Sequence, residues 1–416
     1  MSSNFRDHLR PSDDPRIAGL AELDAYSHAD RILNHPIAHQ LFDRWRALYE
    51  HTEFKGITTD GKCVSGLFTL QDEQAPVQAS MQAISHLLQG LTPEQTAVVQ
   101  HAHDARQWHA WMNPEVYMMR FGLRLDELQP QTRDDILAVL RASLSPQGFE
   151  RARQLMKINH FLGELVQAPR ILNEYSYNFN LFGTPSVTEP WGWNFYGHHL
   201  CLNCRFIGSQ MVLTPVFMGA EPHAIDVGPL AGIPVFEKEE SGGLQLMQSL
   251  PLKLQQQAQL FALKRDPSMP LGRIAFGDEL TLTGAFQDNR IIPEEGVCAR
   301  AMPAAHQTQL LALMHTYLAY LPEGPRSARL RENHAHLDNT WFCWIGGIDD
   351  ESPFYYRIQS PVLIIEFDHH AGVFLGNPTP EKFHIHTLVR TPNGNDYGMD
   401  LVRQHCECMQ KFSLPR

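Results

Sequence analysis

The sequence predicts an α+β protein with a mainly helical N-terminal third and a substantial mixed or antiparallel sheet in its C-terminal part. Three observations support this prediction. From Val77 to about Gln167, apolar residues recur at helical spacing. From Trp341 to the stretch that ends at Arg390, aromatic and β-branched residues dominate, as in strands. The chain also contains 28 prolines and 28 glycines, which favours many turns over a long helical array.

The first 170 residues are expected to form an arm followed by a helical region. Residues 1–34 are polar and contain prolines, which is typical of a surface arm. Residues 35–170 are expected to be mainly helical, apart from a hairpin over Phe54–Leu70 that turns at Asp60-Gly61. The helices predicted in this region cover His35–Glu50, a segment that begins at Thr92-Pro93, a segment containing Asp134–Leu140, and Phe149–Val166.

Residues 171–416 are expected to form an α+β region that carries a candidate metal site. No linker separates this region from residues 35–170, so the two form either one continuous domain or two. Helices are predicted at Leu250–Leu263 and Pro303–Leu321. Strands are predicted at Trp191–Phe217, as a pair broken at Gly197 and Gly208, and at Trp341–Ile345, Tyr355–Phe367 and Phe383–Val389.

The composition narrows the classes of function. The formal net charge of −12 argues against a nucleic-acid-binding surface, which needs clustered Lys and Arg. No apolar run approaches ~18 residues, so no membrane helix is expected. The N-terminus lacks the apolar segment of a signal peptide, and seven cysteines without an export signal favour reduced thiols in the cytoplasm. We therefore expect a small-molecule substrate as the partner, with the oligomeric state left open.

One pair of histidines points to a metal. His384 and His386 lie two residues apart on a predicted strand, so both side chains project from one face with Cα atoms roughly 6.5–7 Å apart. Two imidazoles at that separation can converge on one ion. Arg390 falls on the same face by parity and is expected to hold an anionic substrate group. The alternative is a pair of histidines on a solvated strand face.

The preceding strand carries a second group of candidates. Four successive apolar residues, Val362–Ile365, predict a strand that is buried on both faces. Asp368 and His370 would share one face of it, while His369 would project from the other. Either Asp368 or His369 is therefore expected to face the site. The alternative is a buried carboxylate that pairs with an arginine such as Arg357.

Histidines elsewhere supply further candidate ligands. His336 repeats the His-x-His spacing with His334, in what is predicted to be a loop entering a strand. His198 and His199 would point in opposite directions on a strand, so at most one of them, taken as His199, joins the site. Each of these histidines could instead be exposed or packed without any ligand.

Four motifs together resemble a known family. The first is Gly56–Gly61, and the second combines Trp191–Leu200 with Phe217–Pro222. The other two are Tyr355–His369 and His384–Gly398. Together they resemble the uncharacterised family catalogued as domain of unknown function 3500, and the resemblance covers nearly the whole chain. It implies one evolutionary unit and no particular activity. The family pattern includes Asp368-His369 without His370, which favours His369 as a ligand.

These residues predict a metal-dependent enzyme that acts on a small polar or carboxylated molecule. A divalent Zn, Fe or Mn ion is expected, and water activation by a hydrolase or lyase is narrowly favoured. The alternatives are a non-haem iron oxidoreductase that uses dioxygen and a non-catalytic binding protein with structural histidines. No serine-hydrolase elbow, dinucleotide fingerprint or Walker loop is present. The candidate ligands are His384, His386, His369, His336 and His199; the candidate catalytic residues are Glu221, Asp368 and Arg390; the candidate substrate-binding residues are Arg357, Arg390, Asn393 and Tyr397.

Two of these candidates have ordinary structural alternatives. Glu221 is a possible general base, but a glutamate before a proline in a loop is often only a turn residue. The segment Asn393–Tyr397 could cradle a substrate, or it could be a tight turn that uses asparagine and glycine for positive φ angles.

Overall fold

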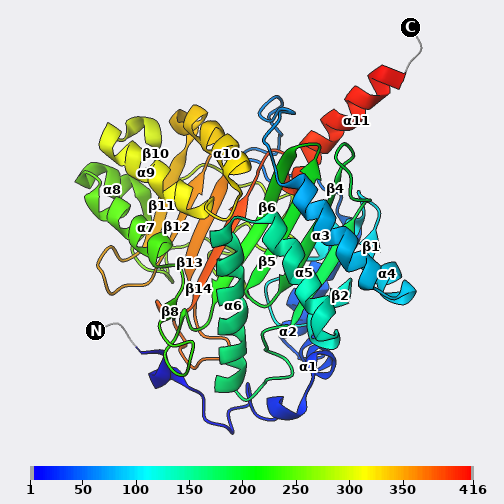
Figure 1. Cartoon of the computed structure of the whole chain (residues 1–416). Helices are drawn as coiled ribbons and strands as arrows, with labels where there is room; N and C mark the ends of the chain where they lie inside the picture. The colour runs from blue at the N-terminus through cyan, green and yellow to red at the C-terminus, as the bar shows by residue number, and fades with distance from the viewer. Residues whose placement is uncertain (1–3, 414–416) are drawn as a thin grey trace.

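The computed structural model of the chain describes residues 4–413, and its centre is a mixed sheet of twelve strands (Figure 1). The strand order is β1-β3-β4-β5-β6-β14-β13-β12-β11-β10, with β2 beside β3 and β9 beside β11. The predicted α+β class and the substantial sheet are confirmed. The strands are β1 Gln100–His101, β2 Leu123–Arg124, β3 Tyr177–Phe182, β4 Trp191–Gly197, β5 Leu200–Ile207, β6 Gln210–Ala220, β9 Gln259–Phe261, β10 Val297–Cys298, β11 Trp341–Gly346, β12 Phe354–Gln359, β13 Ile364–His369 and β14 Ile385–Arg390; β7 Ala224–Ile225 and β8 Ile233–Pro234 form a separate pair.

The large sheet consists of two antiparallel meanders that meet at its centre. Strands β3 to β6 are consecutive neighbours in one half, and strands β11 to β14 are consecutive neighbours in the other. The last strand of each half, β6 and β14, pair antiparallel, with Gly219 opposite His386. Because the halves meet through these strands, residues near 199–220 and residues near 370–390 lie side by side.

Helices cover one face of the sheet, which is turned to the viewer in Figure 1. Helices α3, α5 and α6 lie over the first meander, and α7, α9 and α10 lie over the second. One hydrophobic core joins this layer to the sheet and contains Ile136 and Leu155 as well as Ile365. Regions 35–170 and 171–416 therefore share a core. The helices are α1 Ala25–Leu33, α2 Ala38–His51, α3 Val77–Gly90, α4 Pro93–Val99, α5 Pro130–Ser143, α6 Pro146–Leu165, α7 Glu237–Ser249, α8 Leu252–Ala258, α9 Ala304–Tyr317, α10 Glu323–Ala335 and α11 Met399–Ser413.

The two faces of the sheet differ in what covers them. On β14, Ile385 and Val389 pack into the core under the helices, so we call that side the helix face. Leu388 packs on the opposite side, against a second core that includes residues of α1, α2 and the segment 108–119. We call this side the loop face. Alternation along the strand places His386 on the loop face with Leu388.

Several predicted elements are confirmed, with adjusted boundaries. The helix start at Thr92-Pro93 is confirmed: Thr92 and Gln95 form a capping box at the start of α4. The predicted breaks at Gly197 and Gly208 are also confirmed, but they separate three strands, β4, β5 and β6, instead of two. The predicted strand Tyr355–Phe367 is likewise two strands, β12 and β13, joined by a turn.

The predicted hairpin over Phe54–Leu70 is wrong. Within this segment only Thr58 forms a bridge, and its partner is Ile291. The backbone N–H groups of Lys55 and Gly56 donate to the side chain of Asn289 instead of to a partner strand. The turn at Asp60-Gly61 is present, since the N–H of Lys62 donates to the side chain of Asp60, but the flanking segments form no strand ladder with each other. The predicted N-terminal arm also contains a helix, α1, capped by Asp24.

Helix α7 and the end of α10 lie in segments that were not predicted to be helical. Helix α7 contains the pair Gly242-Gly243, which weakens any helical signal. Position 243 requires glycine, because a Cβ atom there would come within 2.3 Å of the Tyr356 ring. Residues His334 to His336, predicted to be a loop, lie at the end of α10.

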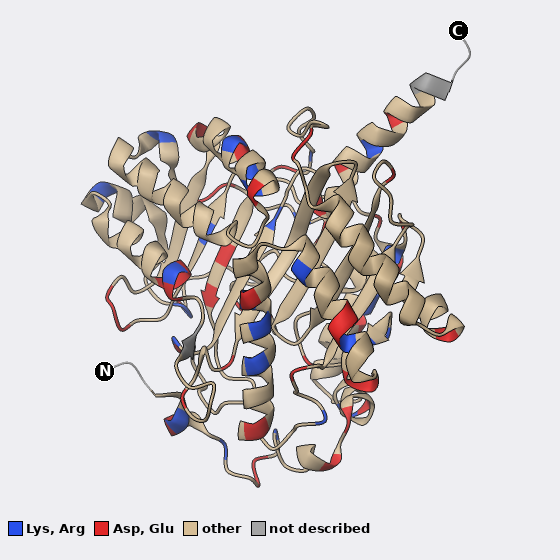
Figure 2. Cartoon of the chain, in the orientation of Figure 1, with Lys and Arg blue, Asp and Glu red and all other residues tan. Residues whose placement is uncertain are grey.

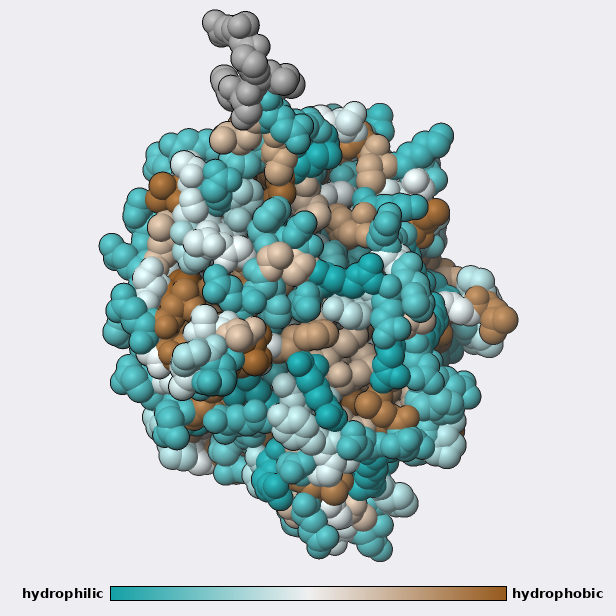
Figure 3. Space-filling model, turned by 90° about the vertical axis from the view of Figure 1, so that its right-hand side faces the viewer, coloured by the Kyte–Doolittle hydropathy of each residue, from teal (hydrophilic) through white to brown (hydrophobic). Residues whose placement is uncertain are grey.

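The surface is mixed in charge and polarity. Figure 2 shows Lys and Arg interspersed with Asp and Glu along the helices, and an acidic segment within β13. On the face in Figure 3, apolar residues are scattered among hydrophilic ones. Among residues 4–413, no helix is long and apolar enough to cross a bilayer.

Candidate metal centre

Five imidazoles come together on the loop face, near the pairing of β6 with β14. They come from three places: the turn between β4 and β5, the segment after β13, and the beginning of β14. Every one of these side chains is buried, with 6 % exposure at most. A concentration of titratable groups under such complete burial requires a specific physical account. The five are His198, His199, His370, His384 and His386.

Three of the five direct the same ring atom at one another. Nε2 of His386 lies 3.0 Å from Nε2 of His199 and 3.1 Å from Nε2 of His384. The ligand atoms of these three residues all lie within 4.8 Å of one another. The close approach depends on Gly219, because a Cβ atom there would lie 3.0 Å from Cδ2 of both His199 and His386. We call His199, His384 and His386 the histidine group.

The turn between β4 and β5 aims His199 at β14. His199 adopts a positive φ of 60°, an uncommon conformation for a residue with a Cβ atom. Its backbone N–H donates to the carbonyl of Asn113, and its carbonyl accepts from the N–H of Gly219. His198 stacks on His199 with ring centroids 3.8 Å apart. The expectation that these two side chains diverge was wrong, because they lie in a turn and not within a strand.

The tautomer of His384 is fixed by its surroundings. Nδ1 lies 2.8 Å from the carbonyl oxygen of Ala371, and since a carbonyl can only accept, Nδ1 carries the proton. In the neutral ring, Nε2 then holds a lone pair directed at His386. Glu221 steadies the loop after Ala371 by accepting the N–H groups of residues 373–375. Such hydrogen bonds behind a ligand are typical of metal sites.

Burial keeps the histidine group neutral. Burial, together with the neighbouring imidazole of His370, lowers the pKa of His384 to about 3. The same two causes hold the pKa values of His199 and His386 well below the usual value of a histidine. Stacked His198 has a pKa of about 4 for the same first reason. Neutral imidazoles are the form that binds metal ions.

A second group of possible ligands adjoins the first. The ligand atoms of Glu279, Asp368 and His370 also lie within 4.8 Å of one another. The His370 ring is 3.8 Å from that of His386, and its Nε2 lies 3.0 Å from Oδ2 of Asp368. Buried Lys264 forms an ion pair with the same carboxylate. We call Glu279, Asp368 and His370 the carboxylate group.

A family model described as protein of unknown function (DUF3500) matches residues 73–399, more than half of the chain. The chain belongs to this family. The matched DUF3500 region contains both the histidine group and the carboxylate group, and it ends at the first residue of α11. No curated protein and no solved structure matches the chain.

Strand β13 of the DUF3500 region decides between Asp368 and His369. Asp368 lies on the loop face, directly opposite His386 in the register of the two strands. His369 lies on the helix face, where its Nδ1 accepts the N–H of Phe354. His369 therefore cannot share an ion with His386. The prediction that favoured His369 over Asp368 was wrong. His370, which the resemblance disfavoured, is the histidine that reaches the cluster.

Other predicted site residues lie away from the histidine group. His336 ends α10 beside β11, three strands from β14. Arg357 ion-pairs with Glu295 at 2.9 Å. The side chain of Asn393 bonds backbone groups of residues 64 and 361. Asn393 and Gly394 both have positive φ angles, as in a tight turn. Glu221, expected as a general base, uses its carboxylate to bind backbone N–H groups.

Arg390 is also committed to partners within the chain. Its Nε donates to Asp396 at 2.8 Å, Nη1 donates to the carbonyl of Thr283 at 3.0 Å, and Nη2 pairs with Asp288. The hydroxyl of Tyr397 lies 3.1 Å from Asp288 and belongs to the same network. Parity placed Arg390 on the correct face, but its nitrogens bind carboxylates and a carbonyl instead of facing the histidine group.

Several residues around the site were not predicted. Lys264, Asp278 and Glu279 lie in an irregular segment where no periodicity marks which side chains point inward. Burial raises the pKa of Asp278 to about 7, and His370 opposes that rise. A carboxyl with such a pKa exchanges a proton readily near neutral pH. A glycine-rich stretch, Gly272 to Gly284, was the sole signal in the sequence that this segment packs closely.

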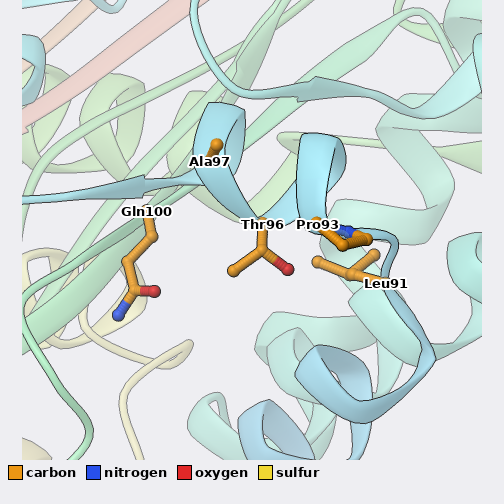
Figure 4. Close-up of a pocket in the computed structure, with 5 residues that line it drawn as sticks. All are labelled: Leu91, Pro93, Thr96, Ala97 and Gln100. Atoms are coloured by element: carbon orange, nitrogen blue, oxygen red, sulfur yellow. The ribbon is translucent and has the colours of Figure 1, made fainter.

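The cavity beside the histidine group on the loop face is small. Its volume is about 20 Å³, and it is lined by His198 together with Glu115, Tyr196 and other residues of the loop face. That volume holds about one water molecule. The broader hollow in Figure 4, about 620 Å³ beside α4, is an open depression lined by Leu91, Pro93, Thr96, Ala97 and Gln100, and carries none of the site residues.

Proposed function

We propose that this protein is a metal-dependent enzyme that acts on a small polar or carboxylated molecule, and that the histidine group holds a divalent Zn, Fe or Mn ion. One observation carries the proposal: Nε2 of His386 faces the Nε2 atoms of His199 and His384 at 3.0 and 3.1 Å. An N–H group on one ring can satisfy the lone pair of only one other Nε2 atom, whereas a cation satisfies the lone pairs of all three. Ligand atoms around a tetrahedral zinc lie about 3.3 Å apart.

The donor set agrees with this choice of metals. Three neutral nitrogens with carboxylates close by suit Zn, Fe or Mn. Among the described residues, no cysteine belongs to either group of possible ligands, which disfavours a soft-metal site. Nε2 of His370 lies 3.0 Å from Oδ2 of Asp368, and the His370 ring lies 3.8 Å from that of His386, so a further imidazole and a carboxylate adjoin the histidine group.

Water activation by a hydrolase or lyase is the favoured reaction class. A divalent ion with an open position would lower the pKa of a bound water and polarise a substrate oxygen. The chain's own residues fix the imidazoles: Ala371 sets the His384 tautomer, and Gly219 leaves room for two rings. Asp278, with a pKa of about 7, is a buried group near His370 that can take up or release a proton. The complete burial of the ligands favours a small substrate.

A second candidate is an iron-dependent oxidoreductase that uses dioxygen. The observation in its favour is the cross-strand pairing of Asp368 with His386, which sets a carboxylate beside the imidazoles. Two histidines and one carboxylate are the ligands of such iron sites. Against it, Asp368 already pairs with Lys264. We favour water activation because zinc needs no redox partner.

A cytoplasmic location and a small-molecule partner belong to the same proposal. All seven cysteines are free thiols, which is the usual state in a reducing compartment. The net charge of −12 argues against nucleic acid as a partner.

Elemental analysis of the full chain, purified without an affinity tag, tests the metal. We expect about one equivalent of a transition metal per chain, and less than about 0.2 equivalents in His386→Ala. His336→Ala is the matched control, since it also removes one imidazole but lies outside both groups, and it should retain the metal. The wild-type protein holding less than about 0.2 equivalents, with no uptake on titration, would leave the histidines a structural role. If the metal is iron, oxygen consumption during substrate screening separates the two reaction classes.

A further inference from the structure

A cavity of about 470 Å³ lies on the helix face, on the opposite side of β6 and β14 from the histidine group. Its floor includes Met218 and Thr387, which neighbour Gly219 and His386 along their strands. Helices α6, α7 and α9, which cover the face seen in Figure 1, supply its walls. The volume falls in the range of small-molecule sites. The cavity and the histidine group are thus back to back on the same two strands.

Two buried polar side chains that line this cavity lack partners. Glu239 is 6 % exposed, and its Oε2 has no hydrogen-bond partner within the chain. Tyr320 is 8 % exposed, and its hydroxyl also has none. Leaving such a group unsatisfied destabilises the folded state, and a charged group more than a neutral one. Two of them in one cavity indicate a place that a ligand completes.

The polarity of these groups defines the ligand. A carboxylate oxygen can only accept, so it requires a donor. The other carboxylate oxygen of Glu239 pairs with Arg151 at 3.2 Å, which leaves Oε2 for something else. Burial and the charge of Glu239 both raise the pKa of the Tyr320 hydroxyl, and the two residues line the same cavity. Tyr320 can accept a second hydrogen bond from the same donor group.

Charge and apolar surface add to this definition. The lining contains three acidic residues, Glu150, Glu237 and Glu239, against Arg151 and Lys238. Arg151 is engaged by Glu239 and lies over the Phe236 ring at 5.1 Å. The floor is apolar apart from Thr387, and Phe236 and Tyr317 add aromatic surface. The site therefore suits a cation with an apolar body, and a primary ammonium offers three N–H donors on one atom.

We infer that this cavity binds a small organic cation, a primary ammonium on a short apolar body, through Glu239 and Tyr320. This site is separate from the proposed metal centre, since the sheet lies between them. Its ligand is recognised by a charge-assisted hydrogen bond to Oε2 of Glu239, a weaker one to the Tyr320 hydroxyl, and contact of the body with Met218 and Val389.

Calorimetric titration of the full chain with 2-phenylethylamine tests the inference, with 2-phenylethanol as the neutral analogue of the same shape. We expect saturable binding of the amine at one site, and at least tenfold weaker binding of the alcohol. Glu239→Gln should weaken amine binding by about tenfold or more, because it removes the charge that the ammonium meets. Tyr320→Phe should weaken it by about threefold or more, because one hydrogen bond is lost.

Two control variants separate this site from its surroundings. Glu237→Gln removes an exposed carboxylate at the same cavity and should change the affinity less than twofold. His386→Ala should bind the amine as wild type does, whether or not the metal proposal holds. No binding up to about 50 mM amine, equal affinity for the alcohol, or unchanged affinity in Glu239→Gln would each overturn the inference. If Glu239→Gln fails to fold, as judged by circular dichroism, Tyr320→Phe decides, and unchanged affinity there overturns it.

Discussion

The two ends of strand β14 bury polar side chains on the same face of the sheet but pair them differently. At the start of the strand, the nitrogens of His384 and His386 face one another and a third imidazole. At its end, Arg390 meets Asp288, Asp396 and a backbone carbonyl, so donors face acceptors. The comparison teaches how to read buried polar clusters. A balanced set of donors and acceptors stabilises the fold by itself, whereas like atoms that face one another indicate a site completed by a ligand.

The charge states of the two ends support this distinction. Burial lowers the pKa of His384 to about 3, so the histidine end is neutral at pH 7. Burial alone would raise the pKa of Asp288, but the charge of Arg390 and a bond from His109 outweigh it and hold the pKa at about 2. Arg390 and Asp288 are therefore ionised and paired. Substitutions at the arginine end should lower the free energy of unfolding, whereas substitutions at the histidine end should lower the metal content.

The largest effect is expected from Arg390→Met. The substitution leaves Asp288 and Asp396 as buried carboxylates without their cation, which typically lowers the free energy of unfolding by about 3–5 kcal/mol. Urea denaturation of the two proteins measures the change. Arg403→Met is the matched control, because that arginine pairs with two carboxylates on the exposed side of α11 and should cost less than about 1 kcal/mol. Equal losses in the two variants would remove the distinction between a buried network and a surface one.

The next effect should come from removing the metal. An ion bound to the native state at about 100 times its dissociation constant raises the free energy of unfolding by about 2.7 kcal/mol. Thermal unfolding with a chelator, and again with the metal that elemental analysis identifies, measures this contribution. We expect the midpoint to rise with metal in the wild type and to stay unchanged in His386→Ala. A metal-dependent rise of the same size in both proteins would mean that the ion binds elsewhere.

Strand parity accounts for what could be predicted of the site. Side chains two residues apart share a face, so the sequence correctly grouped His384 with His386 and Asp368 with His370. Parity also put Arg390 on that face. Parity says nothing about distance, however. Arg390 lies four residues along the strand from His386, or about 13 Å, which is too far to reach an ion held by His386.

What could not be predicted depends on contacts between distant segments. His199 reaches β14 because β6 and β14 are neighbours in the sheet. The order of strands in a sheet cannot be predicted from local periodicity. Lys264 and Glu279 approach Asp368 from an irregular segment with no hydrophobic pattern. Likewise, the helical region was predicted by its period and the strand region by its aromatic and β-branched residues, whereas the hairpin at 54–70 was predicted from a turn between β-rich flanks and was wrong.

A smaller effect on stability, with a clear effect on metal, is expected from Gly219→Ala. A Cβ atom there would lie 3.0 Å from one ring carbon of His199 and 3.0 Å from one of His386, and 2.9 Å from the carbonyl oxygen of Ile385. This overpacking should lower the free energy of unfolding by about 1–3 kcal/mol and push the two rings apart. Competition with a metal indicator should show affinity at least tenfold weaker. Gly90→Ala is the control, since its Cβ would meet only a carboxylate oxygen of Asp135 at 3.8 Å, and its metal affinity should be unchanged.

The smallest effect is expected from Tyr397→Phe, at the arginine end. The hydroxyl accepts the indole N–H of Trp111 at 2.8 Å and donates to Asp288, so its removal leaves the indole N–H without that acceptor. Loss of such a bond should lower the free energy of unfolding by about 1–2 kcal/mol in urea denaturation. Tyr26→Phe, whose hydroxyl bonds Glu127 at the surface, should change it by less than about 0.5 kcal/mol. The metal content of Tyr397→Phe should equal that of the wild type, because the arginine end satisfies its own hydrogen bonds. A loss of metal in this variant would mean that the two ends of β14 are coupled and that the arginine network helps to position the histidine group.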